Sequence, residues 1–269
     1  MYTIDELKQI AKKVRRGILE QVYTAKSGHP GGALSCADIL TAIYFNLANV
    51  DPKNPNKEDR DRIILSKGHA SAALYSVLAH RGYFDVEELK TFRKLHSGLQ
   101  GHPSLGKLPG VDMTSGSLGQ GLSIANGMAL AEKLDNKGYY TYAILGDGEI
   151  EEGQIWEAAM SAAHYKLNKL IVFVDNNGLQ IDGTVADVIN PTPIKEKFDA
   201  FGFNTIEIDG HDFEQIQSAI QKAKESTKKP TAIIAKTVKG KGVSFMENNI
   251  GWHGKAPNEE QYNSALANL

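Results

Sequence analysis

The stretch from Ala143 to Gly183, AILGDGEIEEGQIWEAAMSAAHYKLNKLIVFVDNNGLQIDG, predicts a βαβ unit with a polar turn after each strand. Residues 139–145 and 169–174 form short apolar runs with β-branched side chains, which is typical of buried strands, whereas residues 154–165 have the apolar spacing of a helix. A crossover helix of this kind joins two parallel strands of one sheet. The sequence therefore predicts a parallel α/β core around this unit.

Each strand of the unit ends in residues that suit an anion and a hard cation. Gly146 and Gly148 flank Asp147, so the backbone can turn tightly there and its N–H groups can approach a phosphate. Asn176 and Asn177 follow the second strand with amide oxygens. Such oxygens suit Mg²⁺, which takes six oxygen ligands and leaves positions for a diphosphate and water. The alternative is a pair of ordinary βα turns in which glycine serves the geometry and Asp or Asn caps a helix.

The two turns, with residues 149–175 between them, resemble the GDG and NN parts of the thiamine diphosphate (ThDP) motif. The surrounding sequences GDGEIEEGQIWEA and DNNGLQIDG resemble transketolases. By that resemblance the chain is the N-terminal, diphosphate-binding subunit of a split transketolase that uses ThDP and Mg²⁺. The resemblance implies that Asp147, the Asn177 side chain and the Leu179 carbonyl hold Mg²⁺, while the Gly148 N–H meets the diphosphate.

The composition is that of an ordinary globular protein. The 269 residues are 41% apolar, enough for one large domain, and we expect a single ThDP-binding domain over residues 1–269 with 245–269 as a C-terminal tail or helix. A net charge of −2 and a pI near 6.5 argue against a nucleic-acid surface. Cys36 is the only cysteine, which excludes an internal disulfide, and no long apolar run marks secretion or a membrane span. We expect a cytoplasmic protein without nucleic-acid or membrane partners.

Helical and strand patterns alternate along the rest of the chain. They predict a three-layer α/β/α fold with a mostly parallel sheet and ligands at the carboxyl ends of the strands, which by resemblance is the thiamine-diphosphate-binding fold. The expected helices are 4–25, 36–47, 70–81, one capped at 85–88, 122–134, 191–200, 212–225 and 258–269, and the further strands are 62–65, 204–208 and 231–235.

Four histidines lie in turns that could face a ligand. His29 lies in SGHPGG, His69 in SKGHA, His102 in GHP and His253 in WHGK. Imidazole titrates near neutral pH and can donate or accept a proton, yet each of these histidines could equally cap a helix or fill a loop. By resemblance all four are catalytic, and His69 and His253 also contact the diphosphate. The other histidines match no functional position of the family: His80, His96, His164 and His211.

Two glycine-containing loops complete the predicted site. SGSLGQG precedes a helix, and its resemblance to transketolases implies that Gly116, Ser117 and Leu118 lie against the cofactor rings. KTVKGKG resembles the family's closing loop, in which Lys239 would meet the diphosphate. Without the resemblance, the first loop is a tight helix entry and the second belongs to a flexible basic tail.

The activity implied by resemblance is transfer of a two-carbon ketol unit from a ketose phosphate to an aldose phosphate, as in the pentose phosphate pathway. The chain corresponds to the first of three transketolase domains, so we expect a partner subunit with the pyrimidine-binding and C-terminal domains, in an α2β2 assembly. A homodimer using Glu151 or Glu152 to activate the cofactor is an alternative. Two further alternatives are another ThDP-dependent synthase, such as the deoxyxylulose-phosphate type, and a non-catalytic ThDP-binding regulatory subunit.

Overall fold

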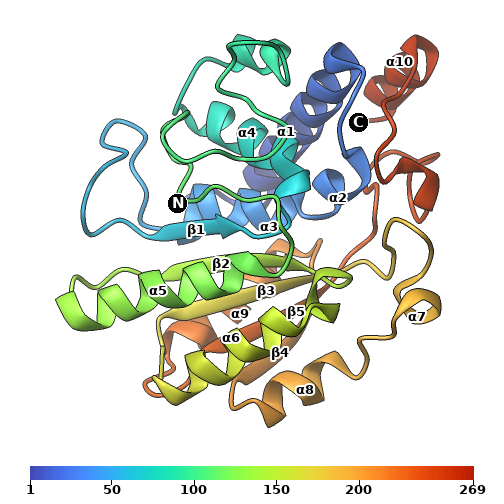
Figure 1. Ribbon diagram of the computed structural model, residues 1–269. Helices are drawn as coiled ribbons and strands as arrows, with labels where there is room; N and C mark the ends of the chain where they lie inside the picture. The colour runs from blue at the N-terminus through green and yellow to red at the C-terminus, as the bar shows by residue number, and fades with distance from the viewer.

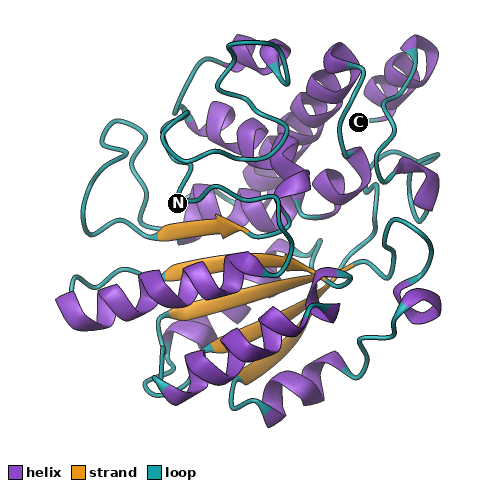
Figure 2. Cartoon of the chain, in the orientation of Figure 1, coloured by secondary structure: helices purple, strands orange, loops and turns teal.

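A five-stranded parallel sheet forms the centre of the computed structural model, which describes all 269 residues (Figure 1). The strand order is β1-β2-β3-β5-β4, and every neighbouring pair is parallel. Helices cover both faces of the sheet (Figure 2), so the predicted three-layer α/β/α fold is confirmed. The strands are β1 (Arg62–Leu65), β2 (Thr141–Gly146), β3 (Leu170–Asn176), β4 (Asn204–Asp209) and β5 (Thr231–Lys236).

Successive strand residues point into two different apolar cores, because side chains alternate across a sheet. Ile144 and Phe173 belong to the larger core, and their neighbours Leu145 and Val174 belong to the smaller core on the opposite face. The larger core is covered by α1 (Ile4–Ala25), α2 (Pro30–Ser35), α3 (Ala37–Ala42), α4 (Ser71–Arg81), α9 (Phe213–Lys224) and α10 (Glu259–Asn268). The smaller core is covered by α5 (Gln120–Asp135), α6 (Gly153–His164) and α8 (Ile194–Ala200).

The longest helix, α1, illustrates how local sequence sets these elements. The Thr3 side chain accepts a hydrogen bond from the Glu6 N–H and the Glu6 carboxylate accepts one from the Thr3 N–H, which satisfies two free donors at the helix start. Leu7, Val14 and Ile18 then recur on one face and are fully buried. No helix of the chain combines the length and the apolar character that crossing a membrane requires.

The expected elements are present, but several bounds were wrong. The turn predicted at residues 27–32 is shorter, because α2 begins at Pro30, whose fixed φ suits the first helical position. The helix predicted over 36–47 changes after α3 into a π-helical turn, Ile43–Leu47. The residues after the cap at Asp85 form a 3-10 helix, Val86–Thr91, rather than an α-helix.

The segment between β3 and β4 also differs from its prediction. The helix expected over 191–200 begins only at Ile194, because Pro191 and Pro193 disfavour helical backbone at the residues before them. A short helix that was not predicted, α7 (Val185–Val188), precedes it, and the Thr184 side chain accepts a hydrogen bond from the Asp187 N–H at its start.

Candidate active site

A pocket of about 270 Å³ lies at the carboxyl edge of the sheet, where the turns after β1, β2, β3 and β5 meet. Apart from Ser117, every residue predicted to bind the cofactor or the metal lines this pocket. Ser117 is exposed, while its neighbours Gly116 and Leu118 face the pocket. The parallel order of the strands explains the convergence, because carboxyl ends of neighbouring parallel strands lie at one edge.

His102 lies behind the wall of this pocket rather than in it. Its ring packs against Gly116, 3.3 Å from the position that a Cβ would occupy there, and it lines a wider neighbouring cavity of about 670 Å³. Pro103 and polar or glycine residues line that cavity, whereas the predicted cofactor residues surround the smaller pocket. His102 is thus the one predicted histidine placed between two cavities.

The three predicted metal ligands lie on the turns after β2 and β3. The Asp147 carboxylate is 2% exposed and accepts hydrogen bonds from the N–H groups of Gly148, at 2.9 Å, and Gly178. The Asn177 amide oxygen accepts from the Leu179 N–H at 3.2 Å. No cluster of three or more His, Cys, Asp or Glu side chains in the chain could hold a metal ion. A cation in this pocket would therefore depend on one carboxylate assisted by neutral oxygens.

The chemistry of this donor set fits Mg²⁺. A carboxylate, an amide oxygen and the Leu179 carbonyl are all hard oxygen ligands. Burial, with the nearby charge of Asp175, raises the pKa of Asp147 to about 6. A divalent cation would favour the ionised carboxylate that burial disfavours. At Gly148 a Cβ would come within 3.1 Å of the Gln180 side chain, so the turn there has little room for any larger residue.

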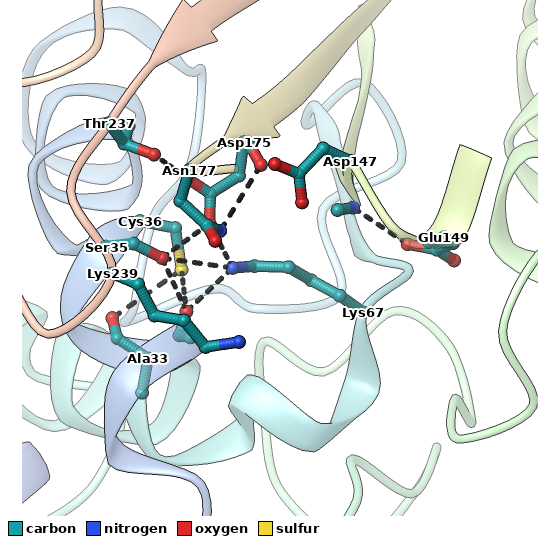
Figure 3. Close-up of polar contacts among 12 residues, drawn as sticks. Ala33, Ser35, Cys36, Lys67, Asp147, Glu149, Asp175, Asn177, Thr237 and Lys239 are labelled. Carbon is teal, nitrogen blue, oxygen red and sulfur yellow. Dashed lines mark hydrogen bonds and ion pairs between the residues drawn. The ribbon is translucent and has the colours of Figure 1, made fainter. Parts of the chain in front are cut away.

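A buried ion pair beneath the pocket was missed in the sequence analysis. The Lys67 ammonium contacts the Asp175 carboxylate, which also accepts hydrogen bonds from the Ser35 and Thr237 hydroxyls (Figure 3). Lys67 donates further to the Gly32 carbonyl at 2.7 Å. Burial opposes ionisation of Asp175, but the charge and hydrogen bond of Lys67 outweigh it and lower the pKa of the carboxyl. The network joins the ends of β1, β3 and β5 to α2.

Glu149 is a second buried carboxylate that was missed. It is 2% exposed and accepts hydrogen bonds from the Ser66 hydroxyl and from the N–H groups of Gly119 and Gly146, both at 3.0 Å. Burial raises its pKa despite these bonds. It therefore fixes the loop around Gly119 against the end of β2, in the position from which Leu118 reaches the pocket.

Three predicted histidines converge although the sequence separates them widely. The ring centroid of His29 lies 5.4 Å from that of His69 and 5.5 Å from that of His253, and the centroids of His69 and His253 lie 5.2 Å apart. Burial is the main cause that lowers the pKa of His29 and of His253 to about 4, and it holds the pKa of His69 well below its usual value. All three rings are therefore neutral near pH 7.

Lys239 reaches the same place from the loop after β5. Its side chain is buried, and its ammonium donates to the Leu179 carbonyl at 3.0 Å and to Nδ1 of His253 at 2.9 Å. That contact leaves the ring proton of His253 on Nε2. Burial and the charge of Lys67 lower the pKa of Lys239 to about 8. A diphosphate would stabilise this ammonium, because an opposite charge favours the charged form.

The fold and this site define a class of protein, namely α/β proteins that hold a phosphorylated cofactor at the carboxyl edge of a parallel sheet. Residues 6–268 match the family model described as "Transketolase, thiamine diphosphate binding domain". The chain therefore belongs to the transketolase family, as its N-terminal, thiamine diphosphate-binding part.

Curated relatives of two lengths match the chain. The "6-deoxy-6-sulfo-D-fructose transketolase subunit SqwG" of Clostridium sp. (strain MSTE9) is 44% identical over 264 residues, which cover 98% of this chain and 96% of that protein. An apulose-4-phosphate transketolase subunit of Phocaeicola vulgatus is 41% identical, and the match covers 98% of this chain and 93% of that protein. "Transketolase 1" of Escherichia coli is 41% identical, but the match covers 91% of this chain and only 38% of that protein.

Solved structures of transketolases also match the chain. The transketolase of Campylobacter jejuni superposes with a TM-score of 0.91 at 39% identity, covering 98% of this chain and 42% of that chain. The transketolase of Leishmania mexicana gives a TM-score of 0.92 at 33% identity, with 98% and 41% covered. The chain thus spans about two fifths of these proteins. The prediction of an N-terminal transketolase subunit, hence of an enzyme of the transferase class, is confirmed.

Proposed function

We propose that this chain is the diphosphate-binding subunit of a two-chain transketolase that moves a two-carbon ketol unit from a ketose phosphate to an aldose phosphate. One observation carries the proposal: Asp147, Asn177, Leu179 and Lys239 meet in a single pocket of a transketolase-family chain. Relatives of about the same length are named as transketolase subunits, which supports a division of the enzyme into two chains.

The metal and the diphosphate would be held by different groups of the pocket. Mg²⁺ would take the oxygens of Asp147, Asn177 and Leu179. The diphosphate would accept hydrogen bonds from the Gly148 N–H and the Lys239 ammonium, and its charge suits both donors. When bound, ThDP supplies the stabilisation of negative charge at carbon that ketol transfer requires.

The remaining predicted residues would contact the rest of the cofactor and the substrate. His69 would contact the diphosphate, and the main chain of Gly116, Ser117 and Leu118 would lie against the cofactor rings. His29 and His253 are neutral near pH 7, and Nδ1 of each ring faces a cationic donor, Arg93 and Lys239 respectively. The remaining Nε2–H of each ring could donate to a sugar hydroxyl or take part in proton transfer. His102 would do the same from the neighbouring cavity.

A C-terminal partner subunit would complete the pocket, with two copies of each chain in the assembly. Full-length transketolases extend well beyond the region that this chain matches. In addition, two apolar side chains that line the pocket are exposed: Leu118 by 38% and Ile181 by 62%. Such apolar surface is typical of a face that another chain covers. The cytoplasmic location predicted from the sequence belongs to the same proposal.

The test is a reconstitution assay. The purified chain, saturated with ThDP and Mg²⁺, is assayed for two-carbon transfer from xylulose 5-phosphate to several aldose phosphates, alone and mixed with the polypeptide encoded by its neighbouring gene. Because one relative is named for a sulfonated fructose, 6-deoxy-6-sulfofructose is tested as a second donor. We expect turnover only in the mixture, and a mixture containing Asp147→Ala serves as the inactive control. Robust turnover by the chain alone would refute the two-chain proposal.

A further inference from the structure

A chain of hydrogen bonds leads from α1, through a buried ion pair and a partly buried histidine, to the loop that carries Lys239. The Arg15 guanidinium donates two hydrogen bonds to the Asp38 carboxylate of α3, one of them at 2.8 Å. Asp38 Oδ2 lies 2.8 Å from Nδ1 of His211, and the Val238 N–H donates to Nε2 of the same ring at 2.9 Å. His211 thus joins a buried ion pair to the backbone immediately before Lys239.

The same ion pair holds the other end of the loop. Nε of Arg15 donates to the Lys241 carbonyl at 3.1 Å. The backbone between these two anchors makes two further bonds, from the Gly240 N–H to the Gly31 carbonyl at 3.0 Å and from the Asn248 N–H to the Lys239 carbonyl at 2.9 Å. Both ends of the segment 238–241 are therefore fixed through Arg15, Asp38 and His211.

The contacts of His211 define its tautomer. Because Nε2 accepts a hydrogen bond from a backbone N–H, that nitrogen carries a lone pair, and the proton must lie on Nδ1, where it faces Asp38. Burial opposes ionisation of Asp38, but the charge of Arg15 and the hydrogen bonds from His211 and Arg15 lower its pKa, so the acceptor remains charged. The ring can serve both partners only in this one form.

Lys239 needs such support because its ammonium lies in unfavourable surroundings. The side chain is 2% exposed, and the charge of Lys67 acts on it in addition to burial. A flexible lysine would turn toward water, because hydration favours the charged form. The fixed backbone of its loop keeps it in the pocket instead, which Lys67 also lines (Figure 3).

We propose that His211 is a positioning residue that fixes the Val238 backbone and thereby holds the Lys239 ammonium where the diphosphate binds. That the diphosphate is the ligand of Lys239 rests on the proposed function. His211 itself lines a different cavity, of about 570 Å³, together with Val238 and Lys241, and does not line the cofactor pocket. Its effect on the cofactor must therefore pass through the loop.

Two substitutions separate the two contacts of the ring. In His211→Gln the side-chain amide can reach the place of Nε2 and accept from Val238, whereas in His211→Asn it reaches only the place of Nδ1 and keeps Asp38. We expect His211→Asn to weaken ThDP binding about tenfold, because the partly buried Val238 N–H loses the acceptor that fixes it, and His211→Gln to stay within about threefold of the parent. Binding is measured by calorimetry in saturating Mg²⁺. His80→Ala, which removes a half-buried histidine bonded to the Lys13 carbonyl, is the matched control.

A second measurement needs no cofactor. Hydrogen exchange of the Val238 amide should become faster in His211→Asn and remain protected in His211→Gln and His80→Ala. Thermal melting of each variant is recorded, because a merely structural role would lower stability without a selective loss of ThDP affinity. Equal ThDP affinity and equal Val238 protection in His211→Asn and the parent would overturn the proposal, and so would a loss of stability alone.

Lys239→Ala distinguishes failure of this inference from failure of the proposed function. If Lys239→Ala binds ThDP like the parent, the assignment of Lys239 to the diphosphate is wrong, and with it the cofactor part of the proposal. If Lys239→Ala binds weakly while His211→Asn binds like the parent, only the positioning role of His211 is overturned. Weak binding in both, with faster exchange at Val238, supports the proposal.

Discussion

Replacing Lys67 by methionine should destabilise the chain by about 3 to 5 kcal/mol, because Asp175 would keep a buried charge without its partner. The side chains of Lys67 and Asp175 are 2% and 0% exposed, so water cannot take the place of the ammonium. The hydroxyls of Ser35 and Thr237 would still donate to the carboxylate. These two bonds compensate only in part, since neither brings a positive charge.

The dependence of stability on pH should change its sign in this variant. In the parent the pKa of Asp175 is lowered, so its contribution to stability is present above the unfolded value of about 4 and is lost as pH falls through the folded value. In Lys67→Met burial would dominate and raise the folded pKa above the unfolded value. Stability should then be greatest in acid and fall as pH rises above about 4, by up to about 1.4 kcal/mol per pH unit.

Equilibrium urea denaturation, followed by tryptophan fluorescence at several pH values, measures both effects. Lys12→Met, at an exposed lysine of α1, is the control and should behave like the parent. The double variant Lys67→Met with Asp175→Asn should regain part of the loss, because the neutral amide oxygen still accepts a hydrogen bond and no buried charge remains. A loss below about 1 kcal/mol in Lys67→Met, with the pH dependence of the parent, would refute this reasoning.

Three further substitutions test other parts of the site. Asp147→Ala should abolish Mg²⁺-dependent ThDP binding in calorimetry, because it removes the only anionic metal ligand. The control Asp182→Ala, at an exposed position, should bind ThDP like the parent. Unchanged ThDP affinity in Asp147→Ala would contradict the metal assignment. Glu149→Gln should lower the free energy of unfolding in urea by about 1 to 3 kcal/mol, because its amide N–H₂ would face a donor such as the Gly119 N–H. Stability equal to that of the parent would argue against that contact. His253→Ala should lower turnover of the reconstituted enzyme while its melting temperature stays near that of the parent, and full activity would exclude a catalytic role.

Much of the fold could be predicted because its signals are local. The apolar run at residues 62–65 coincides with β1, and the runs around the central βαβ unit became β2 and β3 within a few residues. Strands covered on both faces are apolar along their whole length, so short continuous runs that alternate with helical patterns indicate a parallel sheet. Bounds were wrong where proline or a 3-10 turn decided the geometry, as at Pro30 and after Asp85.

The sequence alone determined which turns could carry chemistry. Glycines beside Asp147 and the asparagines after β3 are visible as a pattern, and a parallel sheet brings such turns to one edge. What only the tertiary structure decided is which distant side chain pairs with each buried charge. Lys67 and Asp175 are 108 positions apart, and Asp38 and His211 are 173 apart. No local spacing marks such pairs, because a buried charge is stabilised by whichever partner the packing of distant elements brings within hydrogen-bond distance.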